Sequence, residues 1–338
     1  MITTSIEQAA SVLIKGEVIG LPTETVYGLA ANCYNDEAVK KIFELKKRPN
    51  DNPLIVHVKD AAAAEELVTS APEIAKRLMD EFWPGPLTLL LPKSNTISDS
   101  VTANSPLVAL RSPDHEMALA LLKTIDFPLV APSANPFMSV SPTSAQHVIS
   151  EFSELQADAI ACLIDGGASE VGIESTIVDL SRIATSGPAL LRPGHITAEQ
   201  ISSVLGLELI APDQSAPRVS GALDAHYAPR TPLLLIKQDE LSQVMSKLQE
   251  NNQSFVVMTC GGGQSSFQPS AVMTHQLPLD AKAYAHGLYA GLRLLDEKKA
   301  QVLLVELPPQ DEAWRGVNDR LRRAAFESTD YFKKMQSN

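Results

Sequence analysis

Hydrophobic positions in the first two thirds of the chain follow two periods in turn. Stretches of about ten residues place apolar side chains on one helical face, and short apolar runs bounded by proline, glycine or charged residues separate them. This alternation predicts an α/β fold with some antiparallel strand pairing, and it leaves the strand order open. The predicted helices are residues 6–15, 36–47, 61–68, 71–82, 116–123 and 143–152; the predicted strands are residues 18–21, 53–58, 87–91, 107–110, 129–131, 159–164 and 176–179.

The pattern changes near residue 210. Residues 211–220, with the sequence APDQSAPRVS, are polar, contain two prolines and have no period, which is typical of a linker. Beyond them apolar and helical stretches alternate again, which predicts a second, smaller α/β domain. We therefore predict three parts: a first domain at residues 1–210, a linker at 211–229 and a second domain at 230–338. The strands predicted in the last part are residues 233–236, 254–259 and 301–306, and the helices are residues 240–249 and 284–298.

Composition narrows the class of protein. A chain of 338 residues that is 44% hydrophobic suits two folded domains. The net charge of -12 argues against a surface built throughout for nucleic acid, although it allows a local basic groove. The cysteines Cys33, Cys162 and Cys260 lie far apart without CxxC spacing, which excludes a zinc ribbon and fits a reducing cytosol. We expect neither a signal peptide nor a membrane span, and a cytoplasmic location.

Polar and cationic side chains follow several of the predicted strands. Thr25 belongs to the polar segment PTET that comes directly off a strand, where ligands of open α/β sheets bind; it is equally suited to a capped turn. Lys46 and Arg48 close a helix just before Pro49. They either offset the helix dipole or hold phosphate.

Further candidates come from later strand ends. His57 ends the run PLIVHV, where a histidine is more often a satisfied core residue than a ligand. Arg111 and Arg192 end apolar runs, and a buried arginine needs an internal partner or an anionic ligand. Hydroxyls and amides cluster around residues 133–143 and at Ser175 and act as helix caps or anion ligands. The sequence contains no P-loop, HExxH or GxSxG motif, and we predict no protein metal site. The set suits a nucleotide beside a small polar anion.

Seven segments occur in an order that resembles the threonylcarbamoyl-AMP synthases in their two-domain form. The resemblance covers about the first 205 residues through PTETVYGL, KKRPNDNPLIVHV, WPGPLT, APSAN, SPT, GIESTIVD and LLRPG. The family's Lys-x-Arg signature is matched by Lys46 and Arg48, and its Ser-x-Asn signature by Ser133 and Asn135. HYAPRTPL matches the second domain, whereas VSGALDAHYAP departs from the family's usual linker.

This resemblance implies a fold and a reaction. The fold would be a twisted, mixed parallel and antiparallel sheet of the YrdC-like type around a large concave cavity, followed by a Rossmann-like domain. The reaction would join L-threonine, bicarbonate and ATP, with Mg²⁺, into threonylcarbamoyl-AMP and pyrophosphate. Downstream tRNA threonylcarbamoyl transferase proteins would use the product to modify tRNA, and no membrane would be involved.

The resemblance also implies roles for individual residues. Lys46 and Arg48 would act in catalysis, and residues 211–229 would form a lid in which Tyr227 covers the nucleotide. The residues implied to bind ATP are Arg48, Asn52, Ser133, Asn135, Ser141, Arg192 and Tyr227; those implied to bind L-threonine are Thr25, His57, Arg111 and Ser175.

Two alternatives stay open at this point. The chain could be a module that binds double-stranded RNA in a basic concave surface. It could also be another carbamoyl transferase, because YrdC-like domains occur in hydrogenase-maturation proteins, although the additional zinc-finger and acylphosphatase-like segments of those proteins are missing here.

Overall fold

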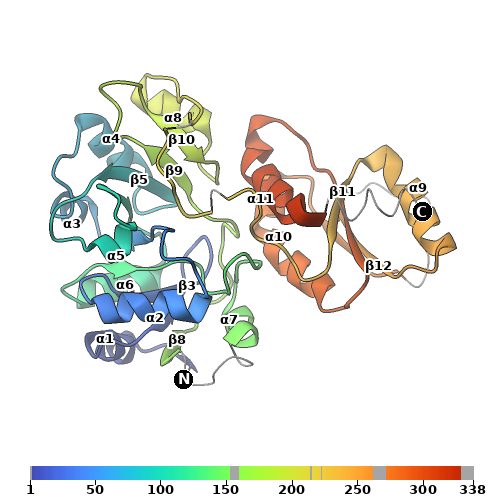
Figure 1. Ribbon diagram of the computed structural model, residues 1–338, viewed down its shortest axis with the longest axis horizontal. Coiled ribbons are helices and arrows are strands. Elements are labelled where there is room, and N and C mark those ends of the chain that lie inside the picture. The colour runs from blue at the N-terminus through green and yellow to red at the C-terminus, as the bar shows by residue number, and fades with distance from the viewer. Residues whose placement is uncertain (1, 153–159, 214, 222, 262–271, 329–338) are drawn as a thin grey trace. The chain divides into compact units, whose positions relative to one another are not determined.

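A computed structural model of the chain describes residues 2–152, 160–213, 215–221, 223–261 and 272–328 (Figure 1). The chain forms two compact units. The first comprises residues 1–137 and 141–222, and the second comprises residues 138–140 and 223–338. The predicted boundaries at residues 210 and 229 stay predictions. Among the described residues, no helix combines the length and the apolar character that crossing a membrane would require.

The first unit contains a mixed sheet of ten strands in the order β1-β8-β2-β3-β7-β4-β6-β5-β9-β10, which confirms the predicted mixed α/β fold. For example, β4 runs parallel to β6, and β7 runs antiparallel to β4. The strands are β1 (Ile2–Thr3), β2 (Ile19–Leu21), β3 (Gly28–Asn32), β4 (Ile55–His57), β5 (Leu87–Pro92), β6 (Leu107–Arg111), β7 (Leu129–Val130), β8 (Cys162–Ile164), β9 (Thr176–Asp179) and β10 (Ala189–Arg192). The helices are α1 (Ile6–Ile14), α2 (Asp36–Lys46), α3 (Ala61–Glu65), α4 (Glu73–Phe82), α5 (Asp99–Thr102), α6 (Glu116–Thr124), α7 (Ala145–Phe152) and α8 (Ala198–Leu205).

The central strands of this sheet are buried on both faces. One face contributes to the main core, whose members include Val56, Leu89, Leu110 and Val178 of the strands and Ile42 and Leu78 of α2 and α4. On the other face, Ile55 and Ala109 belong to a smaller apolar cluster that also contains Val219, from the segment after α8. Because side chains alternate along a strand, the next residues on this second face are His57 and Arg111. A polar row therefore lies beside a buried apolar strip.

The end of helix α2 places two basic side chains, Lys46 and Arg48, near the loop that follows β7, an interior strand of this sheet. The Asn35 side chain caps the first turn of α2 by accepting a hydrogen bond from the Ala38 N–H. The helix ends at Lys46, and Lys47 adopts the left-handed conformation with φ of 51°. This sharp end directs Arg48 back toward the body of the unit, where it is buried.

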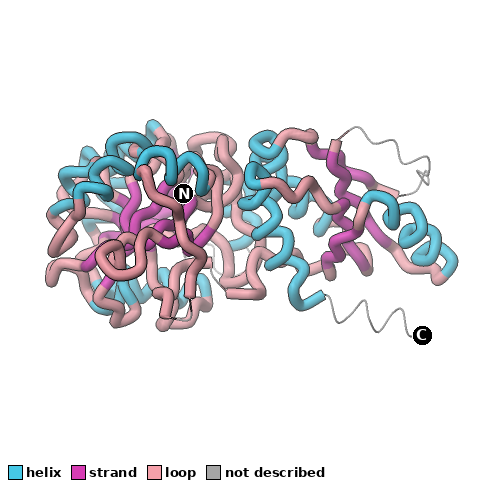
Figure 2. The backbone as a smooth tube through the Cα atoms, turned by 90° about the horizontal axis from the view of Figure 1, so that it is seen from above, coloured by secondary structure: helices cyan, strands magenta, loops and turns pink. Residues whose placement is uncertain are grey.

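The second unit is built around a parallel sheet of four strands in the order β11-β14-β12-β13, so it is the second α/β domain that the sequence predicts. Helix α9 packs on one face through Leu241 and Met245, against Leu234 and Leu304 of the sheet (Figure 2). The Rossmann-like assignment stays a prediction. The elements are β11 (Leu233–Ile236), α9 (Gln238–Glu250), β12 (Phe255–Cys260), β13 (Thr274–Leu277), α10 (Ala281–Asp296), β14 (Val302–Glu306), α11 (Arg315–Ala325) and two 3₁₀ turns, Glu312–Trp314 and Phe326–Ser328.

Candidate functional site

The loop between β2 and β3 holds the guanidinium of Arg111. Arg111 Nη1 donates to Thr25 Oγ1 at 2.9 Å, and Nε donates to the Gly85 carbonyl at 3.3 Å. Its Nη2 lies 2.6 Å from Glu24 Oε1, close enough for an ion pair but without the alignment of a hydrogen bond. Arg111, Thr25 and Glu24 are all at most 4% exposed. This corner therefore contains a buried cation and a buried carboxylate whose hydrogen-bonding capacity is only partly used.

His57 adjoins Arg111, because the two residues are direct partners in the pairing of β4 with β6. Its side chain is 3% exposed, and Nδ1 has no hydrogen-bond partner among the described residues. Burial, and then the positive charge of Arg111, lowers the pKa of His57 to about 3. The imidazole is therefore neutral at physiological pH and offers a ring nitrogen to a bound ligand.

This low pKa makes one prediction about stability. At pH 5, His57 is protonated in the unfolded chain but not in the folded chain. The free energy of unfolding therefore decreases as the pH falls below the unfolded pKa of ~6.5. We expect His57 to contribute about 2 kcal/mol to the loss of unfolding free energy between pH 7.5 and pH 5. Denaturant unfolding of wild type and His57→Gln at both pH values measures it. An equal loss in the two proteins would contradict the shift.

Lys46 ties the end of α2 to the loop that follows β7. Its Nζ donates to the backbone carbonyls of Ser133 at 2.5 Å and Asn135 at 2.6 Å. Lys46 is 1% exposed, and burial, followed by repulsion from Arg48, holds its pKa well below the usual range. The Ser-x-Asn loop is thus fixed by the first residue of the Lys-x-Arg pair.

Arg48 and Arg192 meet through one residue of the predicted linker. Arg48 donates to Asn52 Oδ1 at 2.8 Å and to Ser220 Oγ at 3.3 Å. Arg192 donates to the Ser220 carbonyl at 2.9 Å and to Ser175 Oγ at 3.0 Å. Ser220 therefore joins two arginines that are separated by more than a hundred residues in the chain, and all three residues belong to the first unit.

Two further hydroxyls complete this region. Ser141 Oγ donates to Glu174 Oε1 at 2.6 Å, and both side chains are buried. Ser175 Oγ lies 2.7 Å from Thr88 Oγ1 on the neighbouring strand β5. Glu174 also acts electrostatically on Lys46, which places the acidic group near the cations. The structure thus connects Arg48, Asn52 and Arg192 through hydrogen bonds, and Ser175, which is predicted to bind threonine, is bonded to Arg192 of this group. The other predicted threonine ligands, Thr25, His57 and Arg111, are grouped by their own contacts.

Tyr227 lies in the other unit. Its side chain is 1% exposed, and its ring packs 5.8 Å from that of Tyr289, with the guanidinium of Arg320 5.3 Å from its centre. Its backbone has φ of 62°, which is unusual for a residue other than glycine. The prediction that Tyr227 covers a nucleotide stays a prediction.

Comparison with known proteins identifies the family. Residues 11–194 match a family model described as "Telomere recombination", and residues 196–326 match "Threonylcarbamoyl-AMP synthase, C-terminal domain". The threonylcarbamoyl-AMP synthase of Bacillus subtilis is 40% identical over 327 residues, which cover 95% of this chain and 92% of that protein. The chain belongs to the threonylcarbamoyl-AMP synthase family. It has the two-domain form, because both models match in order.

Two further relatives agree with this assignment. The threonylcarbamoyl-AMP synthase of Pyrococcus abyssi is 36% identical over 94% of this chain and 93% of that protein. The crystal structure of P. abyssi Sua5 complexed with L-threonine has a TM-score of 0.87 and 35% identity, and it covers 96% of this chain and 94% of that chain. The similarity to these synthases therefore spans both units.

The structure adds four residues that the sequence did not single out as site residues: Glu24, Thr88, Glu174 and Ser220. Glu24 could have been suspected, because it stands between two polar residues of PTET. Thr88 and Glu174 contact the predicted residues only through strand pairing and tertiary packing. Ser220 lies in a polar linker, where no local pattern distinguishes a residue that returns to the site.

Proposed function

We propose that the first unit binds L-threonine and ATP in adjacent subsites and, with bicarbonate, converts them into threonylcarbamoyl-AMP and pyrophosphate. The enzyme is a threonylcarbamoyl-AMP synthase. The observation that carries this proposal is the similarity, over more than 90% of each chain, to two such synthases. A structure similar over 96% of this chain contains L-threonine, which supports threonine as a substrate.

The threonine subsite is the corner around Arg111. In this proposal the guanidinium holds the threonine carboxylate, for which it offers a planar pair of donors. Among the described residues, neither oxygen of the buried Glu24 carboxylate has a hydrogen-bond partner, so this carboxylate suits the threonine amine. His57 and Thr25 then contact the remaining polar groups. Such a site rejects valine, because its own polar atoms would lose their partners without the threonine hydroxyl.

The nucleotide subsite is the region that Arg48 and Arg192 share. Arg48 and Arg192 supply two positive charges, and Lys46 supplies a buried amino group, to a region from which water is largely excluded, where charge stabilisation is strongest. The remaining predicted nucleotide ligands are Asn52, Ser133, Asn135 and Ser141.

The reaction proceeds by two bond-forming steps in this proposal. The threonine amine adds to carbon dioxide derived from bicarbonate, loses a proton and becomes a carbamate. A carbamate oxygen then attacks the α-phosphorus of ATP, and the bond to the bridging oxygen of pyrophosphate breaks. The low pKa of His57 makes it a poor proton acceptor, so we assign it to positioning rather than to general base catalysis.

Mg²⁺ enters this proposal with ATP. Magnesium typically binds substrate phosphates plus one or two carboxylates and keeps several waters. Among the described residues, no group of three acidic, histidine or cysteine side chains could hold a metal by itself. Glu174, beside Ser141 and close to Lys46, is the carboxylate that fits this role. Bound magnesium would help to neutralise the charge that develops on the phosphates.

The segment after α8 that contains Val219 and Ser220 covers the nucleotide subsite in this proposal. Val219 is 6% exposed in the apolar cluster beside Ile55, while Ser220 contacts Arg48 and Arg192. We expect Val219→Asp to lower the yield of threonylcarbamoyl-AMP about tenfold and to raise the hydrolysis of the labile carbamate, because water enters. Product and pyrophosphate are measured in parallel. Equal yields from the variant and from wild type would count against a lid.

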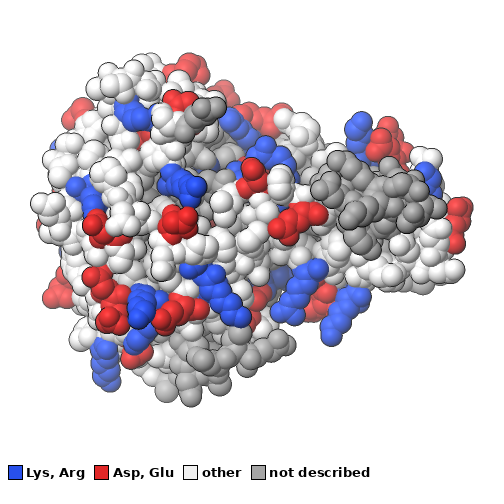
Figure 3. Space-filling model, viewed as in Figure 1, with Lys and Arg blue, Asp and Glu red and all other residues white. Residues whose placement is uncertain are grey.

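The proposal includes partners beyond the substrates. Separate tRNA threonylcarbamoyl transferase proteins would consume the product, and a direct contact of this chain with RNA would be an additional property. Figure 3 shows acidic and basic side chains interspersed over the visible face of the first unit, an arrangement that does not resemble a continuous basic surface. We expect a cytoplasmic location for this chemistry.

Pyrophosphate release with each component omitted in turn tests the function. We expect release only when L-threonine, bicarbonate, ATP and Mg²⁺ are all present, and valine should not replace threonine. Release that is independent of threonine or bicarbonate would contradict the synthase reaction. Salt-sensitive RNA binding that Arg48→Ala leaves unchanged would instead favour the RNA-binding alternative.

A further inference from the structure

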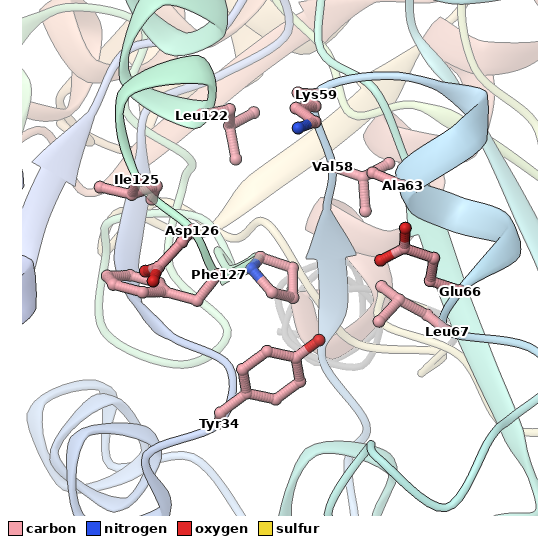
Figure 4. A pocket seen from close by; sticks show the side chains of 11 residues that line it. Tyr34, Val58, Lys59, Ala63, Glu66, Leu67, Leu122, Ile125, Asp126 and Phe127 are labelled. Carbon is pink, nitrogen blue, oxygen red and sulfur yellow. The ribbon is translucent and has the colours of Figure 1, made fainter.

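A separate pocket of about 100 Å³ lies in the first unit, at the ends of β3 and β4 (Figure 4). None of the predicted threonine or nucleotide ligands lines it. Its walls come from Tyr34, which follows β3, from the turn after β4, and from α3 and α6 together with the residues that follow each of these helices. The lining residues are Tyr34, Val58, Lys59, Ala63, Glu66, Leu67, Leu122, Ile125, Asp126, Phe127 and Pro128.

The pocket combines an apolar interior with a charged rim. The interior is aliphatic and aromatic, with Val58, Leu67 and Leu122 buried. The charged side chains around it are Lys59, Glu66 and Asp126, which Figure 4 shows on different sides of the cavity. Among the described residues, none of these three charges has an oppositely charged partner within 4.0 Å. All three side chains are exposed, so charges of both signs lie at the solvent-facing rim of an apolar space.

We propose that this pocket binds a small α-amino acid with an apolar side chain. Such a molecule presents an ammonium group to Glu66, a carboxylate to Lys59 and a hydrocarbon body to the interior, while Asp126 lies on the other side of the cavity. An alkylamine would leave Lys59 without a partner, and a fatty acid would face two carboxylates. A cavity of ~150 Å³ accommodates benzene, so about 100 Å³ suits a branched side chain of the size of leucine.

The pocket lies close in the chain to the predicted threonine ligands. The Val58 N–H donates to the Arg111 carbonyl at 2.9 Å, and the Lys59 carbonyl accepts from Ser112 Oγ at 3.2 Å. Val58 directly follows His57, and the two side chains point to opposite faces of the sheet. A ligand in the pocket would therefore contact the backbone that positions His57 and Arg111.

Binding is tested with leucine as the probe, on the full chain, by saturation-transfer NMR in the presence of saturating threonine. We expect a dissociation constant on the order of 1 mM for leucine, and weaker binding of isopentylamine and isovalerate. Saturating threonine keeps leucine out of the catalytic site. In this blocking step the test rests on the proposed function. Because leucine binding is measured without turnover, failure of leucine binding is distinguishable from failure of the synthase reaction.

Variants in α3 locate the site. Ala63→Phe fills the pocket and should reduce leucine binding about tenfold or more, whereas Ala62→Phe, on an exposed neighbouring position, should leave it unchanged. Lys59→Gln and Glu66→Gln should each weaken leucine binding about tenfold, through the loss of a charge-assisted hydrogen bond. The proposal is overturned if leucine does not bind, if Ala63→Phe binds it as well as wild type does, or if isopentylamine binds as tightly as leucine.

Discussion

Lys46→Ala should lower kcat/KM for pyrophosphate release about 10³-fold, close to 4 kcal/mol of transition-state stabilisation. Two losses combine in this variant. The proposed nucleotide subsite loses a buried amino group, and the carbonyls of Ser133 and Asn135 lose their shared donor. A buried carbonyl without a partner costs about 1–3 kcal/mol, so the loop that carries the Ser-x-Asn signature should move. Steady-state kinetics with ATP as the varied substrate measure the change.

Lys47→Ala is the matched control for this variant. It removes one positive charge from the same helix end, but Lys47 is exposed and lies outside the network that Lys46 forms. We expect its kinetics to stay within about twofold of wild type, since exposed charges are strongly screened. Equal losses in the two variants would mean that net charge matters rather than the buried contact. A denaturant midpoint for each variant separates lost activity from lost folding.

Much of this site could be predicted from local sequence because its cations stand where regular elements end. Lys46 and Arg48 lie where the apolar helical period stops and Pro49 follows, which predicts a helix end. In the structure α2 ends at Lys46. Arg111 and Arg192 end apolar runs, and they are the last residues of β6 and β10. Periods of 3.6 and 2 are local properties, so a single sequence reveals them.

The relations between elements could not be predicted in the same way. Strand β7 pairs between β3 and β4, although nearly a hundred residues separate it from β3, and no local pattern encodes that neighbour. Strand β3 was missed because its small residues, Gly28–Asn32, follow a polar segment and resemble the continuation of a loop. The meeting of Arg48 with Arg192 at Ser220 likewise depends on tertiary packing, since Ser220 comes from a segment without a period.

The two groups of site residues differ in how their charges are compensated. Around Arg48 and Arg192, neutral oxygens of Asn52, Ser175 and Ser220 accept the hydrogen bonds. In the proposed nucleotide subsite, these two arginines would face an anion as highly charged as a triphosphate. Around Arg111, a buried carboxylate opposes the cation, so this corner is close to neutral overall and suits a zwitterion such as an amino acid. The buried ion pair at Arg111 therefore supports the proposal that threonine binds at that corner rather than beside Arg48 and Arg192.

Arg111→Ala should raise the KM for threonine about 100-fold and should also destabilise the protein. Loss of a charge-assisted pair with the threonine carboxylate accounts for the first effect. The second follows because Glu24 would be left buried without its cation, which costs about 3–5 kcal/mol when one partner of a buried pair is removed. A single substitution therefore cannot distinguish a binding role from a structural one.

The double variant Glu24→Gln/Arg111→Gln separates the two roles. This double variant leaves no uncompensated buried charge, so we expect its unfolding free energy to return to within about 1 kcal/mol of wild type. Its KM for threonine should stay raised by about 100-fold, because neither amide supplies the charge that the zwitterion needs. The KM for ATP should change little, since Arg48 and Arg192 keep their contacts with Ser220. Recovery of both stability and threonine KM in the double variant would show that Arg111 acts only through folding, and it would remove the threonine subsite from this corner.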